Sequence, residues 1–151
     1  MDNIIANLSE KQLFTICLYG EARGEPIEGK IAVASVIINR LKKGSYYGKN
    51  LRGVILKPLQ FSCFNELDPV TKKPDPNRKK LEIIAQNFSE YLHSYEHLRE
   101  CYWVAVGFLD CWLTSNVGGA THYNTLKCDP KWDDNMKLIA TIGNHEFFVE
   151  T

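Results

Sequence analysis

The chain has 151 residues, the length of a single domain, and its 18 basic and 18 acidic side chains leave no net charge. Its 44% hydrophobic and 24% charged residues are ordinary for a globular protein, so the composition excludes a disordered or fibrous chain and gives no support to nucleic acid as a partner. No stretch approaches the roughly 20 apolar residues of a membrane-spanning helix, and we expect one monomeric domain over residues 1–151.

The first part of the chain carries start and stop signals of helices. Ser9 and Gln12 have the spacing of a capping box, which predicts a helix over residues 11–21. Pro26 suits the first turn of a second helix, and Gly44 suits its C-terminal end. A short junction therefore separates these two helices.

The middle of the chain alternates helices with loops. A short helix is expected over residues 50–56, and the polar, proline-containing stretch 65–77 is expected to form a surface loop. Apolar residues at helical intervals then predict one continuous helix over residues 76–92.

The last part of the chain combines one apolar helix with strands. The helix is expected over residues 98–113 in the core, with Trp103 and Trp112 buried. Glycine-led segments at 120–124 and 145–149 are typical of short strands that pair as a small sheet. The predicted fold class is α+β and predominantly helical.

The junction between the first two helices concentrates reactive groups. Residues 19–26 hold Glu21, Arg23 and Glu25 together with glycines. A glutamate that is partly shielded there by Tyr19 would have its pKa raised by loss of solvation, as a general acid near neutral pH requires. The same residues also suit a solvated helix end with a Glu–Arg ion pair, which is the commoner arrangement of such side chains.

Five motifs spread over most of the chain help to choose between a general acid and a solvated helix end. They are Tyr19-Gly20-Glu21-Ala22-Arg23-Gly24-Glu25, Gly29-Lys30-Ile31-Ala32-Val33-Ala34 with Asn39-Arg40, Gln60-Phe61-Ser62-Cys63, Ala120-Thr121-His122-Tyr123-Asn124 and Ile142-Gly143-Asn144-His145. Together they resemble cell-wall hydrolases of the spore-cortex-lytic-enzyme type. The resemblance implies a lysozyme-like or lytic-transglycosylase-like domain, with Glu21 at the position of the family's catalytic glutamate and Glu25 at a second acidic position.

The reaction that this resemblance implies is cleavage of the peptidoglycan glycan strand between N-acetylmuramic acid and N-acetylglucosamine. A lytic transglycosylase needs one carboxyl group, so Glu21 alone would form the 1,6-anhydromuramoyl end, with no cofactor and no metal ion. The alternative is a lysozyme-type hydrolase that uses Glu21 with Glu25 as its second carboxylate.

Aromatic and polar side chains of the matching motifs are the expected substrate contacts. Aromatic faces stack on sugar rings, and amides and hydroxyls bind sugar hydroxyl and acetamido groups. For any one aromatic ring, a place in the core is at least as common. The residues expected to bind substrate beside Glu21 are Gln60, Phe61, Ser62, His122, Tyr123 and Asn124.

Two other interpretations belong to different classes of protein. His93-Ser94-Tyr95-Glu96-His97 matches the H-x-x-E-H pattern of zinc metallopeptidases, with His93 and His97 as ligands, although such a short pattern often arises by chance. A non-catalytic wall-binding module is the second, and the presence of Glu21 argues against it.

The sequence also suggests where the protein acts. Five cysteines without a C-x-x-C pair argue against a disulfide framework and suit a reducing cytosol. Asp2 and Glu10 stand where a signal peptide carries positive charge, so we expect a protein that is cytoplasmic on synthesis. Proteins of the resembling type often carry a signal peptide and a wall-binding module. Without them, the expected setting is a phage endolysin that reaches the wall through a membrane lesion made by another protein.

Overall fold

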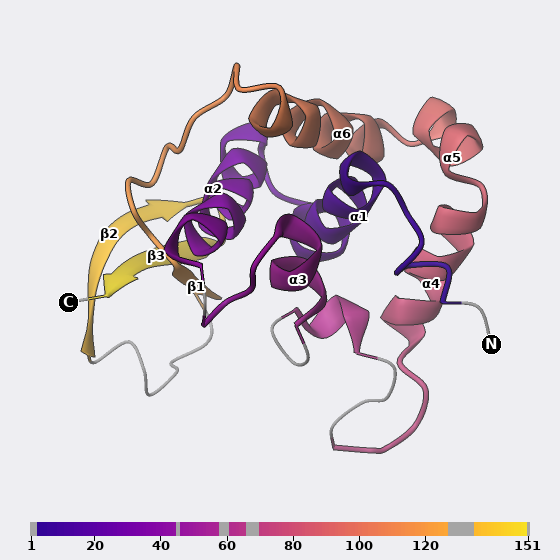
Figure 1. Cartoon of the computed structure of the whole chain (residues 1–151), viewed down its shortest axis with the longest axis horizontal. Coiled ribbons are helices and arrows are strands. Elements are labelled where there is room, and N and C mark those ends of the chain that lie inside the picture. Colours follow the sequence, from indigo (N-terminus) through magenta and orange to yellow (C-terminus); the bar gives the residue numbers. More distant parts are fainter. Residues whose placement is uncertain (1–2, 45, 58–60, 66–69, 127–134, 151) are drawn as a thin grey trace.

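Helix α1 (Glu10–Ala22) lies at the centre of the helical part of the protein (Figure 1). The computed structural model describes residues 3–44, 46–57, 61–65, 70–126 and 135–150. The predicted capping box is formed: Gln12 N donates to Ser9 Oγ at 3.2 Å and Ser9 N donates to Gln12 Oε1 at 3.1 Å. Consecutive residues of α1 are buried, which is typical of a helix surrounded by others.

Two long helices pack against α1 and supply much of the remaining core. They are α2 (Ile27–Lys43) and α6 (Glu96–Leu109), and α6 makes the more extensive contact with α1. Helix α2 ends as the sequence predicts, because Gly44 adopts a positive φ of 70° and its N–H bonds the last carbonyls of the helix.

The segment predicted as one helix over residues 76–92 forms two helices, α4 (Pro76–Gln86) and α5 (Phe88–Ser94), so that prediction is wrong at the join. Asn87 has a non-helical backbone (φ −129°, ψ 43°) and caps the end of α4. Asparagine competes with the helix for backbone hydrogen bonds, which is the physical signal for the break. Helix α3 (Leu51–Leu56) and the 3-10 turn η1 (Ser62–Phe64) fill the other side of α1.

Helix α6 ends four residues earlier than the sequence suggested. Cys111 has a positive φ of 65°, and the N–H groups of Trp112 and Leu113 turn back to the carbonyl of Gly107. A side chain at Gly107 would collide with Leu113, which folds over it. The expected burial of Trp103 and Trp112 is wrong: they form an edge-on pair on the surface, 46% and 49% exposed.

A three-stranded antiparallel sheet lies beside α2 (Figure 1). Its order is β1-β3-β2, with β1 (His122–Thr125), β2 (Met136–Ile142) and β3 (His145–Glu150). The two strands predicted from the sequence are confirmed as β1 and β3. Strand β2 was not predicted, because a register shift between Leu138 and Ala140 interrupts the alternation that identifies strands.

The α+β, helix-dominated class predicted from the sequence is confirmed. None of the helices in the described ranges is long and apolar enough to cross a membrane.

Candidate active site

Glu21 lies in the last turn of α1 and contacts a side chain from the sheet. The hydroxyl of Tyr123, on β1, donates a hydrogen bond of 2.5 Å to Glu21 Oε1 across 102 residues of sequence. Both side chains are partly buried. The structure therefore brings together two of the residues that the sequence assigned to one site.

Burial is the largest influence on the Glu21 carboxyl, and it raises the pKa above its usual value. Hydrogen bonds from Tyr123 and Cys63, and the charges of His145 and Arg40, lower the pKa without cancelling the effect of burial. A raised pKa keeps more of the carboxyl protonated near neutral pH. Glu21 thus has the property that a proton donor requires.

Gly20 allows the turn η1 to lie against the end of α1. A Cβ at Gly20 would stand 2.7 Å from the Sγ of Cys63, so any larger residue would displace this thiol. Cys63 is a free, buried cysteine whose pKa is raised by burial and by the negative charge of Glu21. The thiol therefore stays protonated and serves as a second hydrogen-bond donor to Glu21.

Glu25 follows α1 in the junction and has quite different surroundings. Its Oε1 accepts hydrogen bonds from Asn144 N at 2.8 Å and from His145 Nδ1 at 2.9 Å, and its Oε2 accepts from Asn144 Nδ2 at 2.9 Å. Burial raises the pKa of Glu25, but these hydrogen bonds and the charge of His145 outweigh it, so the pKa is lowered. Glu25 is therefore an ionised carboxylate. Because α1 ends at Ala22, Glu21 and Glu25 do not lie one turn apart on a helix.

The β2–β3 turn is shaped to receive Glu25. Gly143 has a positive φ of 58°, and a Cβ there would stand 2.7 Å from Glu25 Oε1. Glycine is required on both grounds, backbone conformation and space. The turn can then present the Asn144 N–H and the His145 ring to the same carboxylate.

A buried lysine binds the main chain of the junction between α1 and α2. Lys30, on α2, is completely buried, and its Nζ donates to the carbonyl oxygens of Arg23 at 3.1 Å and Glu25 at 2.5 Å. Glu100, on α6, lies 3.7 Å from the same nitrogen. Lys30 thus links the loop that carries Glu25 to the helical core.

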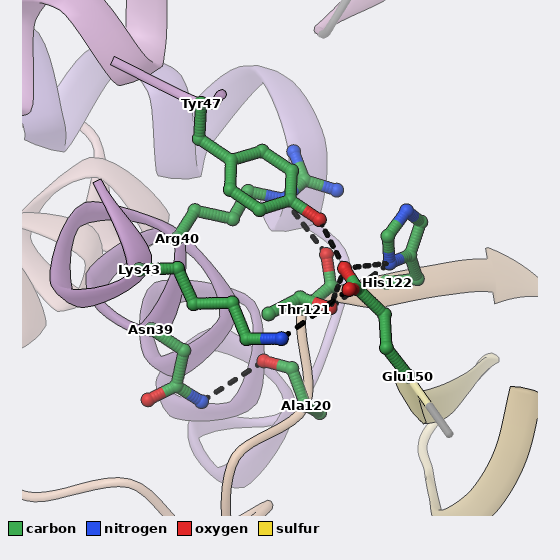
Figure 2. Close-up of polar contacts among 8 residues, drawn as sticks. All are labelled: Asn39, Arg40, Lys43, Tyr47, Ala120, Thr121, His122 and Glu150. Atoms are coloured by element: carbon green, nitrogen blue, oxygen red, sulfur yellow. Dashed lines mark hydrogen bonds and ion pairs between the residues drawn. The ribbon is translucent and has the colours of Figure 1, made fainter. Parts of the chain in front are cut away.

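Helix α2 also holds the segment that leads into β1 (Figure 2). Asn39 Nδ2 donates to the carbonyl of Ala120 at 2.9 Å, and Arg40 Nε donates to the carbonyl of Thr121 at 2.7 Å. These bonds fix the position of the two residues just before β1 relative to α2. They therefore place Tyr123 where its hydroxyl reaches Glu21.

His122 belongs to a different cluster from Tyr123. Successive side chains of a strand point to opposite faces, and Figure 2 shows His122 beside Tyr47, Thr121 and Glu150. Its Nδ1 lies 3.0 Å from Thr121 Oγ1 and 3.9 Å from Glu150 Oε1, while the Tyr47 hydroxyl also donates to Glu150. The expectation that His122 lines one cleft with Glu21 does not agree with this placement.

Two of the other predicted substrate contacts, Phe61 and Asn124, are buried. Phe61 is only 2% exposed and packs under the guanidinium of Arg40, so its ring is part of the core rather than an open cleft face. Asn124 is buried, and its Nδ2 donates to the carbonyl of Thr125. Gln60 and the side chain of Ser62 lie outside the described residues.

A groove of about 550 Å³ lies next to this site, and its lining includes Gly20 and Cys63, the thiol that donates a hydrogen bond to Glu21. Three tyrosines line it: Tyr19 from α1, Tyr91 from α5 and Tyr95 between α5 and α6. The rings of Tyr91 and Tyr95 lie 4.9 Å apart, and Arg23 covers the Tyr19 ring. The lining thus combines aromatic rings with the basic side chains of Arg23 and Lys80.

The histidines of the H-x-x-E-H pattern are not one turn apart on a single helix. His93 lies in the last turn of α5, Tyr95 has an extended backbone, and His97 lies in the first turn of α6, where it contacts Glu100. Across the described parts of the chain, no three His, Cys, Asp or Glu side chains gather as metal ligands would. The geometry therefore gives no support to the metallopeptidase interpretation.

Three residues near Glu21 and Glu25 were not predicted from the sequence to belong to the site. Cys63, Asn144 and His145 stand in matching motifs but were given no function. The signal available for the last two was the Gly-Asn turn in front of a strand, which predicts a hairpin but not its contact with Glu25.

The sequence is similar to a known protein family and to several known proteins. The profile of the family described as Cell Wall Hydrolase matches residues 24–148, a range that includes Glu25, Tyr123 and His145 and begins just after Glu21. A spore cortex-lytic enzyme of Halalkalibacterium halodurans is 38% identical over 148 residues, which cover 96% of this chain and 37% of that protein. The spore cortex-lytic enzyme of Bacillus subtilis is 40% identical over 68 residues, 41% of this chain and 22% of that protein.

Solved structures extend the likeness to the fold. The catalytic domain of the germination-specific lytic transglycosylase SleB from Bacillus anthracis aligns with a TM-score of 0.57 and 25% identity, covering 99% of this chain and all of that one. The catalytic domain of the Bacillus cereus SleB protein gives the same TM-score and identity over 98% of its length. The lysozyme-like fold expected from the motifs is thereby confirmed. This chain spans well under half the length of the two spore cortex-lytic enzymes.

Proposed function

The chain belongs to the Cell Wall Hydrolase family, and from this premise we propose that it cleaves the glycan strand of peptidoglycan as a lytic transglycosylase, with Glu21 as its single acid–base group. The observation that carries the proposal is the raised pKa of Glu21, whose carboxyl accepts a hydrogen bond from Cys63, a residue that lines the aromatic groove. We further propose that residues 1–151 form one catalytic domain that acts as a monomer without a cofactor. Its origin as a phage endolysin stays a prediction from the sequence.

The reaction takes place in two proton transfers. Tyr123 donates to Oε1 of Glu21, which leaves Oε2 to carry the acid proton. Glu21 gives this proton to the oxygen that links N-acetylmuramic acid to N-acetylglucosamine, and the glycosidic bond breaks. The resulting carboxylate takes the proton of the muramoyl C6 hydroxyl as its oxygen attacks C1. The products are a free glucosaminyl hydroxyl and a 1,6-anhydro ring, and no water is consumed.

The surroundings of Glu25 favour this reaction over hydrolysis. A hydrolase needs a second carboxylate that is free to act on water or on the sugar. Glu25 accepts three hydrogen bonds, from Asn144 and His145, and none of these partners is substrate. We therefore assign acid–base chemistry to Glu21 alone.

The groove lined by Tyr19, Tyr91 and Tyr95 is the proposed path of the glycan. Stacking on the rings of such tyrosines orients a sugar ring with little conformational cost to the protein. Arg23 and Lys80, also on the groove, supply positive charge for the acidic groups of the lactyl or peptide substituents. The glycan chain would then run from the side of α4 and α5 towards Glu21.

The proposal is tested by incubating the purified chain with purified peptidoglycan and analysing the soluble products. We expect soluble disaccharide-containing fragments in which the peptides remain attached to the sugars. Release of free peptides with intact glycan strands would contradict it, because that result belongs to an amidase or a peptidase.

Tyr123→Phe is expected to lower kcat about tenfold while leaving the unfolding temperature nearly unchanged. A hydrogen bond to a charged group is worth about 1.5–3 kcal/mol, and 1.4 kcal/mol is a factor of ten in rate. This bond lowers the pKa of Glu21, so its loss raises that pKa and moves the alkaline limb of the kcat profile to higher pH. Tyr46→Phe, at an exposed tyrosine, is the matched control. A parental kcat and pH profile in Tyr123→Phe would show that the hydroxyl is only structural.

Activity is expected to survive EDTA, and no stoichiometric zinc should copurify with the protein. A zinc enzyme loses activity with a chelator and regains it with the metal. His93→Ala should have the parental rate, because His93 is exposed at the end of α5. Activity lost with EDTA and restored by zinc would revive the metallopeptidase interpretation.

A further inference from the structure

Three rings gather on one face of the sheet around the hydroxyl that reaches Glu21. Tyr123 of β1 is directly opposite Phe147 of β3, and His145 lies two residues before Phe147 on the same face. The Tyr123 ring is 5.8 Å from the Phe147 ring and stands edge-on to the His145 ring at 5.2 Å. Phe147 is completely buried and His145 nearly so. The direction of the Tyr123 hydroxyl thus depends on where these two neighbours stand.

Glu25 determines where His145 stands. Its carboxylate is ionised, so His145 Nδ1 must be the proton donor in the 2.9 Å bond between them. This bond fixes both the rotation of the ring and the nitrogen that carries the proton. The turn through Gly143 presents Asn144 to the same carboxylate, and Lys30 Nζ holds the main-chain carbonyl of Glu25.

We propose that Glu25 is a positioning residue for the Glu21 reaction, which acts through His145 to hold the Tyr123 hydroxyl on the Glu21 carboxyl. The inference rests on the proposed function. It assigns a task to the second acidic residue of the junction that differs from that of a second catalytic carboxylate. In this arrangement Glu25 needs to accept hydrogen bonds, and it does not need to react.

Two substitutions of Glu25 separate positioning from chemistry. Glu25→Gln keeps an oxygen for Asn144 N and His145 Nδ1, and a half-turn of the Asn144 amide restores the remaining bond. We expect this variant to keep kcat within about threefold of the parent, since the geometry is preserved. Glu25→Ala releases His145 and is expected to lower kcat roughly ten- to a hundredfold, with KM nearly unchanged.

Double variants test the route through His145 and Tyr123. If Glu25 acts through them, the losses in kcat are not additive: Glu25→Ala with His145→Ala is no slower than the slower single variant, and Glu25→Ala has little further effect in Tyr123→Phe. Glu28→Ala is the matched control, because Glu28 is an exposed glutamate in the first turn of α2. It should keep the parental kcat.

A measurement on the parent protein covers the case in which Glu25→Ala fails to fold. Long-range ¹H–¹⁵N NMR spectra should show a protonated Nδ1 on His145. An unprotonated Nδ1, an inactive Glu25→Gln that is folded, or a Glu25→Ala with parental kcat would each overturn the inference. These outcomes leave the proposed function standing, whereas a fully active Glu21→Gln would remove the proposed function itself.

Discussion

Glu21→Gln is expected to abolish glycan cleavage while the protein stays folded. Glutamine has nearly the same shape and can still accept the Tyr123 hydrogen bond, but it has no acidic proton to give to the leaving oxygen. General acid–base catalysis contributes roughly 10²- to 10⁴-fold, so the residual rate should be about one per cent or less of the parent rate. The measurement is the release of soluble fragments from purified peptidoglycan, with circular dichroism as the test of folding.

Glu28→Gln is the matched control for this experiment. Glu28 is an exposed glutamate in the first turn of α2, close to Glu21 in sequence. Its amide variant should digest peptidoglycan at the parental rate. If Glu21→Gln retained more than a few per cent of the activity, the proton donor would have to be another group.

Lys30→Met is expected to cause the largest loss of stability. Methionine fills much of the same space, but the carbonyl groups of Arg23 and Glu25 lose their buried donor. An unsatisfied buried polar group costs about 1–3 kcal/mol, so we expect the free energy of unfolding to fall by about 2–4 kcal/mol. Urea denaturation followed by circular dichroism measures the change.

Lys42→Met on the same helix is the comparison, because Lys42 is exposed to solvent. Its free energy of unfolding should stay within about 0.5 kcal/mol of the parent value. Equal stabilities for Lys30→Met and the parent would show that the buried ammonium is not what holds the junction to the core.

Local signals were sufficient to predict most of the helical elements. The Ser9 capping box and the glycine at position 44 mark helix ends through backbone chemistry that depends on a few neighbouring residues. The same holds for Asn50, which caps α3. Where tertiary packing decides the outcome, local signals were misleading: the fold-back of Leu113 over Gly107 ends α6 early and leaves Trp112 on the surface.

The site shows the same division between local and distant determinants. The position of Glu21 followed from its motif, and the resemblance placed Tyr123 beside it. Successive side chains of a strand point to opposite faces, and this rule predicts that His122 and Tyr123 do not share one cleft. The bond between Glu25 and His145 could not be predicted from either segment alone, because it joins the α1–α2 junction to a hairpin 120 residues away.

The most direct test of Glu21 acting alone is digestion of purified peptidoglycan in water enriched in ¹⁸O, with the released muropeptides analysed by mass spectrometry. Intramolecular attack by the C6 hydroxyl brings no solvent oxygen into the product. The account therefore predicts muropeptides that end in 1,6-anhydromuramic acid and carry no ¹⁸O. Muropeptides with reducing muramic ends that contain one ¹⁸O atom would contradict it, because a water molecule activated by a second group would then have broken the bond.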